Sequence, residues 1–114
     1  MSNVIDASRR FGFLELRSER SDGDHVIALD GELDLEGAER VTRELRSAEA
    51  TDARRIVLDL SRLEFIESSG IRLIVDADAR SRMNGHRLVL IRGPRSVHRV
   101  FELTAVAERL PFVR

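Results

Sequence analysis

Residues 57–75, VLDLSRLEFIESSGIRLIV, join a strand pattern to a helix pattern through two serines and a glycine. The run from Ile56 to Leu60 is nearly all apolar, which is typical of a central strand covered on both faces. A short loop then leads to Ser68 and Ser69, after which apolar residues recur at helical spacing. We therefore predict a buried strand, a loop and a helix that begins at the serine pair.

The predicted helix has one apolar side and one polar side. Its apolar side, with Ile71, Ile74 and Val75, can face a sheet, and Arg72 lies on the opposite side. Gly85 is suited to the position after the helix, because glycine readily adopts the left-handed conformation that ends many helices.

The rest of the chain supplies further strands and helices on either side of this unit. We predict a hairpin of two strands at 13–16 and 25–29, a helix at 36–50, a strand at 87–91, a helix opened by Gly93 and Pro94, and an edge strand at 110–113. The order β-β-α-β-α-β-α-β indicates an α/β fold with one mixed sheet. That sheet should be antiparallel at its start and parallel across the helical crossovers, with helices packed on it.

The size and charge of the chain favour a single domain that binds another protein. Its 114 residues fit one domain, which we place at residues 13–114 after a flexible N-terminal segment at 1–12. The 19 basic and 20 acidic side chains are interleaved and give a net charge of -1, so nothing indicates nucleic-acid binding. No apolar run approaches the roughly 20 residues that span a bilayer. We expect a cytoplasmic protein without membrane insertion.

The residue types present offer little for catalysis or for cofactors. The chain has no cysteine and no lysine, and His25, His86 and His98 lack metal-ligand spacing. Ser68 lacks the G-x-S-x-G context of a nucleophilic serine, and no histidine is evidently paired with it. We expect neither an enzyme nor a bound metal or cofactor.

The serine pair has both a structural and a functional interpretation. Serine is preferred at helix starts because its hydroxyl can accept from free backbone N–H groups. The same positions carry partial positive charge, which suits a phosphate. Asp34 can likewise cap the helix at 36–50. The residues alone do not decide between a helix cap and a phosphorylation switch. They also do not show which serine, Ser68 or Ser69, would be phosphorylated.

Four short motifs follow one another along the chain: GELD at 31–34, VLDLS at 57–61, FIESSG at 65–70 and VHRVFEL at 97–103. Together they resemble the STAS domain proteins of the anti-sigma factor antagonist family. The resemblance extends from about residue 13 to residue 113, which is nearly the whole chain. It implies a single STAS-like domain.

The resemblance also implies a regulator that switches partners. Unphosphorylated, such a protein binds an anti-sigma factor that is also an ATP-dependent serine kinase, and so releases a sigma factor. Phosphorylation of the first serine, here Ser68, ends that binding, and a serine phosphatase resets the protein. Because a phosphoserine adds about -1.5 to -2 charge, repulsion should oppose docking of an acidic partner surface. The implied partner-binding residues are Asp34, Glu67, Ser69, Gly70 and Arg72.

Glu67 departs from the family pattern, which usually has aspartate immediately before the serine. The charge is kept, but the carboxylate stands one methylene further from the backbone, which alters any local cap. An alternative hypothesis is therefore a constitutive scaffold, for example the small STAS-like subunit that docks on the ATPase of a lipid-transport complex.

Overall fold

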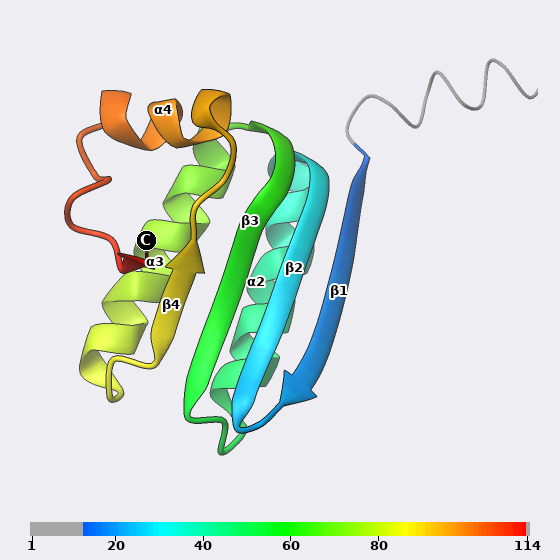
Figure 1. Ribbon diagram of the computed structural model, residues 1–114, viewed down its shortest axis with the longest axis vertical. Helices are drawn as coiled ribbons and strands as arrows, with labels where there is room; N and C mark the ends of the chain where they lie inside the picture. The colour runs from blue at the N-terminus through cyan, green and yellow to red at the C-terminus, as the bar shows by residue number, and fades with distance from the viewer. Residues whose placement is uncertain (1–12, 114) are drawn as a thin grey trace, which may run out of the picture.

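A mixed sheet of five strands with helices packed on it makes up the part of the chain that the computed structural model describes, residues 13–113 (Figure 1). The elements are β1 (Leu14–Ser21), β2 (Asp24–Leu33), α2 (Leu35–Glu49), β3 (Arg55–Ile66), α3 (Ser68–Met83), β4 (Leu88–Ile91), α4 (Arg95–Leu103) and β5 (Phe112–Val113). This order confirms the predicted sequence of strands and helices. The predicted flexible segment at residues 1–12 lies outside the described residues.

The strands follow one another across the sheet in the order β1-β2-β3-β4-β5. β1 and β2 form an antiparallel hairpin whose turn residues, Asp22 and Gly23, both have positive φ. Positive φ at both central residues is typical of the tight turns that match the twist of a hairpin. All later neighbours are parallel, so the predicted mixed sheet is confirmed.

Both α2 and α3 lie on the same face of the sheet, behind the strands in Figure 1. Parallel crossovers are right-handed in nearly all proteins, and here each crossover steps to the next strand in the same direction, so the helices fall on one side. The prediction of cover on both faces of residues 56–60 is therefore wrong, since no helix within residues 13–113 runs along the other face. Val57 is still only 7% exposed, because it lies between Val26 and Val89 of the neighbouring strands.

β2 and β3 are longer than the sequence pattern indicated. The GELD motif, expected after the second strand, belongs to β2 as far as Leu33, and β3 replaces the predicted loop and continues to Ile66. Register shifts between the two strands, near Ala28 and Gly31, interrupt the alternation of buried and exposed residues. Ser61 and Arg62 are therefore two consecutive exposed polar residues, a pattern typical of a loop, although both lie in β3.

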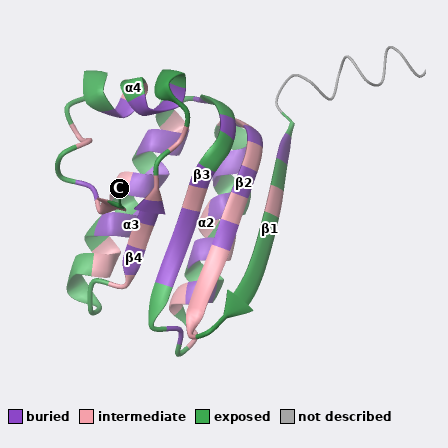
Figure 2. Cartoon of the chain, viewed as in Figure 1, coloured by how far each residue is buried: buried purple, intermediate pink, exposed green. Residues whose placement is uncertain are grey.

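Burial is concentrated where the sheet meets α2 and α3, as Figure 2 shows. Ile71 and Ile74 of α3 face this core as predicted, Val75 is partly buried against it, and Arg72 is exposed. Gly85 directly follows the C-cap of α3 with φ 95°, so the predicted role at the end of the helix is confirmed.

An aromatic cluster fixes β5, the predicted edge strand, against α4. The ring of Phe112 lies 4.8 Å from that of His98 and 5.2 Å from that of Phe101, measured between centroids. Burial lowers the pKa of His98, and the charge of Arg92 adds to this effect. Pro94, predicted at the first helical position, is instead the N-cap of α4, and the helix begins one residue later at Arg95.

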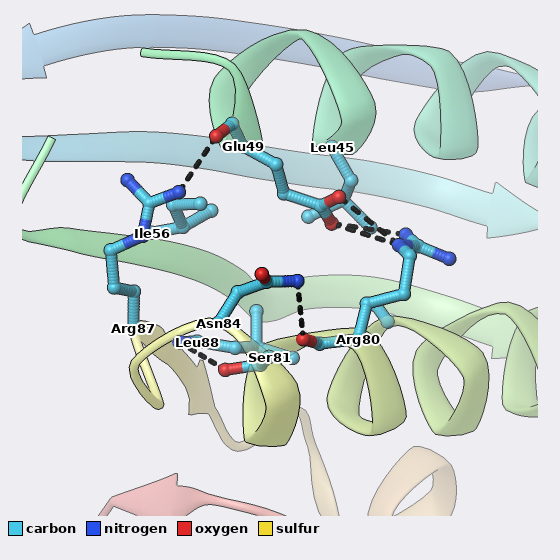
Figure 3. A pocket seen from close by; sticks show the side chains of 9 residues that line it. Leu45, Glu49, Ile56, Arg80, Ser81, Asn84, Arg87 and Leu88 are labelled. Atoms are coloured by element: carbon cyan, nitrogen blue, oxygen red, sulfur yellow. Dashed lines mark hydrogen bonds and ion pairs between the residues drawn. The ribbon is translucent and has the colours of Figure 1, made fainter. Parts of the chain in front are cut away.

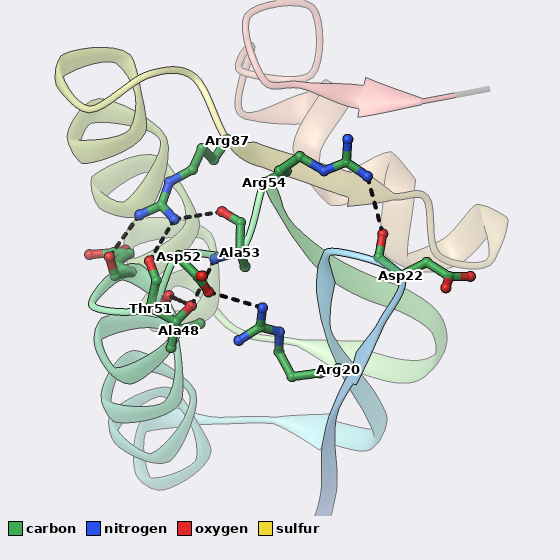
Figure 4. A network of polar contacts seen from close by, with 9 residues as sticks. Arg20, Asp22, Ala48, Thr51, Asp52, Ala53, Arg54 and Arg87 are labelled. Atoms are coloured by element: carbon green, nitrogen blue, oxygen red, sulfur yellow. Dashed lines mark hydrogen bonds and ion pairs between the residues drawn. The ribbon is translucent and has the colours of Figure 1, made fainter.

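Arg87 joins the C-terminal end of α2 to the start of β4 (Figure 4). Its guanidinium donates to the backbone oxygens of Glu49, Thr51 and Ala53 at 2.7, 3.0 and 2.7 Å. Carbonyl groups at the end of a helix lack intrahelical partners, and a cation there also suits the helix dipole. Internal hydrogen bonds therefore hold this end of the domain together.

Two glycines allow a matched test of the β1–β2 pairing. Gly31 has φ 108°, and a Cβ there would collide with the backbone oxygen of Phe13, which accepts from the N–H of Glu32. Gly85 has φ 95°, and its Cβ would find only an Arg87 carbon at 4.0 Å. We expect Gly85→Ala to lower the unfolding free energy by about 1–3 kcal/mol through backbone strain. Gly31→Ala should cost about 1–3 kcal/mol more because of the collision.

Urea denaturation of both variants would measure this difference. Equal losses for Gly31→Ala and Gly85→Ala would show that the close approach of Phe13 does not constrain residue 31.

Candidate functional site

The ends of β2 and β3 bring the starts of two helices together. Leu33 and Ile66 are register partners, and the N–H of Glu67 donates to the Leu33 oxygen at 3.0 Å. Asp34 and Glu67 follow these two strands directly and are the N-caps of α2 and α3. We call this region, residues 33–35 and 65–70, the serine end. Two helix starts with partial positive charge meet there.

Gly70 makes the close approach of α3 to β2 possible. A Cβ at this position would lie 2.8 Å from a side-chain carbon of Ile66 and 2.9 Å from two carbons of Leu33. Gly70 has no side chain and is buried, so it offers no contact surface to a partner. Its effect on the serine end is therefore one of spacing.

The two N-caps have nearly the same backbone conformation but different side-chain contacts. Asp34 has φ -101° and ψ -171°, and its Oδ1 accepts from the Gly37 N–H at 2.8 Å. Glu67 has φ -96° and ψ 172°, yet its side chain makes no capping hydrogen bond. The predicted cap by Asp34 is confirmed, whereas α3 begins without a side-chain cap.

The two serines differ in access to solvent. Ser68 is the first residue of α3 and is exposed. Ser69 is partly buried, and its Oγ is fully covered and has no hydrogen-bond partner within residues 13–113. Ser69 lies in a groove of about 450 Å³ between α2 and α3, which Leu35 and Leu73 also line. An enzyme acting on the folded domain can therefore reach the Ser68 hydroxyl more easily than that of Ser69.

The serine end includes two exposed apolar side chains. Leu35, the first residue of α2, is 64% exposed, and Phe65, near the end of β3, is 46% exposed. The sequence pattern identified neither residue as a functional candidate. A signal was present for Leu35, because it directly follows the N-cap residue and falls outside the apolar stripe of its helix. Exposed apolar residues beside an accessible serine have the character of residues that anchor protein partners.

Charged side chains surround the same serine. Glu64 and Glu67 are exposed on the strand side of Ser68, and Asp34 is partly buried at the neighbouring helix start. Arg72 is exposed one turn further along α3. The structure thus brings Asp34, Glu67, Ser69 and Gly70 together at the serine end, with Arg72 at its border.

A separate hollow of about 350 Å³ lies between the C-terminal ends of α2 and α3 (Figure 3). Its rim includes Arg80, which donates to both carboxylate oxygens of Glu49 at 3.0 and 3.2 Å, and Asn84, which donates to the Arg80 oxygen at 2.9 Å. Ser81 accepts from the Leu88 N–H at 3.0 Å. These polar groups serve internal contacts, so the hollow is a less suitable functional site than the serine end.

The described residues carry no sign of a metal centre or a membrane span. Within residues 13–113, no three histidine, aspartate or glutamate side chains lie together in a way that could hold a metal ion. None of the helices in that range is both long enough and apolar enough to cross a bilayer.

Comparisons with known proteins agree on one family. The family model described as "Mlab, STAS domain" matches residues 16–113. The Bordetella bronchiseptica protein BtrV, named as a putative anti-sigma factor antagonist, is 31% identical over 98 residues. These residues are 86% of this chain and 84% of BtrV.

Solved structures of anti-sigma factor antagonists have the same fold. One from Mycobacterium paratuberculosis aligns with a TM-score of 0.75 at 22% identity, over 87% of this chain and 84% of that one. SpoIIAA in its unphosphorylated form aligns with a TM-score of 0.72 at 24% identity, over 88% and 89% of the two chains. The phosphorylated form of SpoIIAA from Bacillus aligns with a TM-score of 0.67 at 22% identity, over 88% and 92%.

The missing cap at α3 predicts a stabilising substitution. The Gly70 N–H now donates to the backbone oxygen of Glu67 at 2.9 Å. In Glu67→Asp, the shorter carboxylate can accept from this N–H as well, as the carboxylate of Asp34 accepts from Gly37 in α2. We expect the unfolding free energy to rise by about 0.5–1 kcal/mol, within the range for N-cap residues. Chemical denaturation would measure it, with Glu108→Asp as the control, because Glu108 is exposed in the turns after α4. A Glu67→Asp variant no more stable than the control would show that the start of α3 needs no cap.

Proposed function

The chain belongs to the STAS domain family, and we propose that it is an anti-sigma factor antagonist whose partner binding is controlled by phosphorylation of Ser68. Its relative BtrV is named as a putative anti-sigma factor antagonist, and the aligned structures from Mycobacterium paratuberculosis and of SpoIIAA are named as anti-sigma factor antagonists. The observation that carries the proposal is the position of Ser68, exposed at the first residue of α3, while the hydroxyl of Ser69 is covered.

In this proposal the unphosphorylated protein binds an anti-sigma factor with serine kinase activity. That binding frees a sigma factor for transcription. The anti-sigma factor phosphorylates Ser68, the complex dissociates, and a serine phosphatase returns the protein to its binding form. The protein acts in the cytoplasm, as a binding partner rather than an enzyme, and without contact to nucleic acid or insertion into a membrane.

The surroundings of Ser68 explain why a phosphate would end binding. Leu35 and Phe65 offer exposed apolar anchors at the serine end, so in this proposal the phosphate would enter a partly apolar interface. A phosphate carries about -1.5 to -2 charge, and removing it from water without a paired cation is costly. Glu67, exposed beside Ser68, adds a second negative charge that repels an acidic partner surface. Phosphorylation therefore acts through the binding surface and does not require the domain to unfold.

The remaining residues of the serine end have different proposed roles. Asp34 and Glu67 offer carboxylates to the partner, and Asp34 also caps α2. Ser69 contributes through the groove between α2 and α3, and Gly70 acts indirectly by letting α3 approach β2. Arg72 supplies a positive charge at the border of the surface.

A constitutive scaffold is the second candidate function. The matching family model carries the name Mlab, and Glu67 stands where a switching member of the family usually has aspartate. Under this alternative the same surface docks on an ATPase, such as that of a lipid-transport complex, and Ser68 is never modified. Binding to an ATPase that Ser68→Ala leaves unchanged, together with absence of any phosphorylating anti-sigma factor, would favour the scaffold.

Substitutions at Ser68 separate the switch from the scaffold. We expect Ser68→Ala to bind the cognate anti-sigma factor like wild type, and Ser68→Glu to bind at least about tenfold more weakly, because the glutamate brings a charge into the interface. Ser47→Glu is the control, since Ser47 is an exposed helical serine near the C-terminal end of α2, away from the serine end. Isothermal titration calorimetry gives the dissociation constants. Equal affinities of wild type and Ser68→Glu would contradict the switch.

The apolar anchor Leu35 predicts a second effect on the same binding. Leu35→Ala should weaken affinity by about tenfold, the loss typical of a contact at the centre of an interface. Met83→Ala provides the matched control, because Met83 is 84% exposed and ends α3 at the far end from Ser68. Both variants should unfold at the wild-type temperature. If Leu35→Ala and Met83→Ala weaken binding alike, the partner does not dock at the serine end.

A further inference from the structure

Arg72 is an exposed arginine without a partner among residues 13–113. It lies on α3, and within that range its guanidinium makes no hydrogen bond or ion pair. Arg80 and Arg82 of the same helix contrast with it, since they pair with Glu49 and Asp78 at 3.0 Å each. An unpaired arginine that borders a functional surface is available to a negative group on that surface.

Helix geometry places Arg72 beside Ser68. The two residues are four apart in α3, and residues at that spacing are neighbours on the helix surface. Helical side chains also lean toward the N-terminus, so the long side chain of Arg72 covers the preceding turn, where Ser68 lies. The guanidinium can therefore reach an oxygen bonded to the Ser68 side chain.

The corresponding neighbour of Ser69 offers no such contact. Four residues after Ser69 stands Leu73, which is buried in the core. A phosphate on Ser69 would meet an apolar side chain and the groove between the helices. Arg72 also stands three residues after Ser69 and lines the same groove. The Ser69 hydroxyl is covered, however, so Ser68 is the accessible acceptor beside this cation.

We propose that Arg72 binds the phosphate of phosphorylated Ser68 within the same helix and is thereby withdrawn from the partner-facing surface. This inference rests on the proposed phosphorylation of Ser68. In that step the terminal phosphoryl group of ATP is transferred to Ser68 Oγ, a phosphoester forms, ADP leaves and the hydroxyl proton is released. The phosphate then accepts charge-assisted hydrogen bonds from the guanidinium.

The contact between Arg72 and the phosphate changes the partner-facing surface of the domain in two ways. The phosphate adds negative charge next to Glu67, and the positive charge of Arg72 becomes neutralised by the phosphate. The partner therefore loses an attractive contact as well as meeting a repulsive one. The uncapped first turn of α3 favours the phosphate further, because its N–H groups receive no side-chain bond from Glu67.

A titration of the phosphate tests the contact without any binding partner. The domain is prepared with phosphoserine inserted at position 68, and the phosphate is followed by phosphorus NMR from pH 4 to pH 8. Its second pKa is ordinarily about 6. A nearby guanidinium favours the dianion, so Arg72→Gln should raise this pKa by about 0.2–0.7 of a pH unit relative to wild type. Asp34 and Glu67 act in the opposite direction, but they are present in both proteins.

Arg99→Gln is the matched control, because Arg99 is an exposed helical arginine on α4. In Arg99→Gln, the second pKa of the phosphate on Ser68 should equal that in wild type. The melting temperature gives a second readout: phosphorylation should raise it in wild type by about 2–5 °C, and by less in Arg72→Gln. The unphosphorylated variants should melt alike.

An unchanged phosphate titration in Arg72→Gln overturns the proposed contact. If the phosphorylated protein nevertheless fails to bind its anti-sigma factor, the partner switch stands and only the role of Arg72 is refuted. If the titration shifts as expected but phosphorylation leaves partner binding intact, the contact stands and the proposed function is wrong.

Discussion

The parallel pairing of β2 with β3 is the constraint on which the serine end depends. The backbone N–H of Glu67, the N-cap of α3, donates to the oxygen of Leu33, the last residue of β2. The absence of a side chain at Gly70 lets α3 begin against Leu33 at that point. As a result two helix starts, two acidic N-caps and an exposed serine occupy one small surface.

The two ends of the domain are chemically different. At the far end, Arg87 satisfies the carbonyl groups after α2, and Arg80 pairs with Glu49, so polar groups there are engaged within the chain. At the serine end, the carboxylate of Glu67 makes no capping bond, Arg72 has no partner among the described residues, and Leu35 is exposed. One end stabilises the fold, and the other leaves its groups available for binding. A covalent phosphate can therefore change recognition with little effect on the core.

The sequence predicted the order of the elements, the mixed sheet, the helix start at Ser68 and the cap at Asp34, because these depend on local patterns. It did not predict that β3 extends to Ile66, since bulges between β2 and β3 break the alternation on which strand recognition relies. The one-sided helix layer follows from strand order, which is a property of the whole chain. Likewise, only tertiary packing distinguishes the exposed Ser68 from Ser69, whose hydroxyl is covered, although the two are adjacent and identical in type.

The central claim is that a kinase-type anti-sigma factor modifies this domain at a single serine. The most direct measurement is intact mass spectrometry after incubation of the purified protein with ATP and each such kinase from its source, followed by mapping of the modified residue. We predict a gain of one phosphate, located at Ser68 and absent from Ser68→Ala, whereas Ser69→Ala is still modified. No phosphate with any of these kinases, or a phosphate at Ser69 instead, would contradict the account.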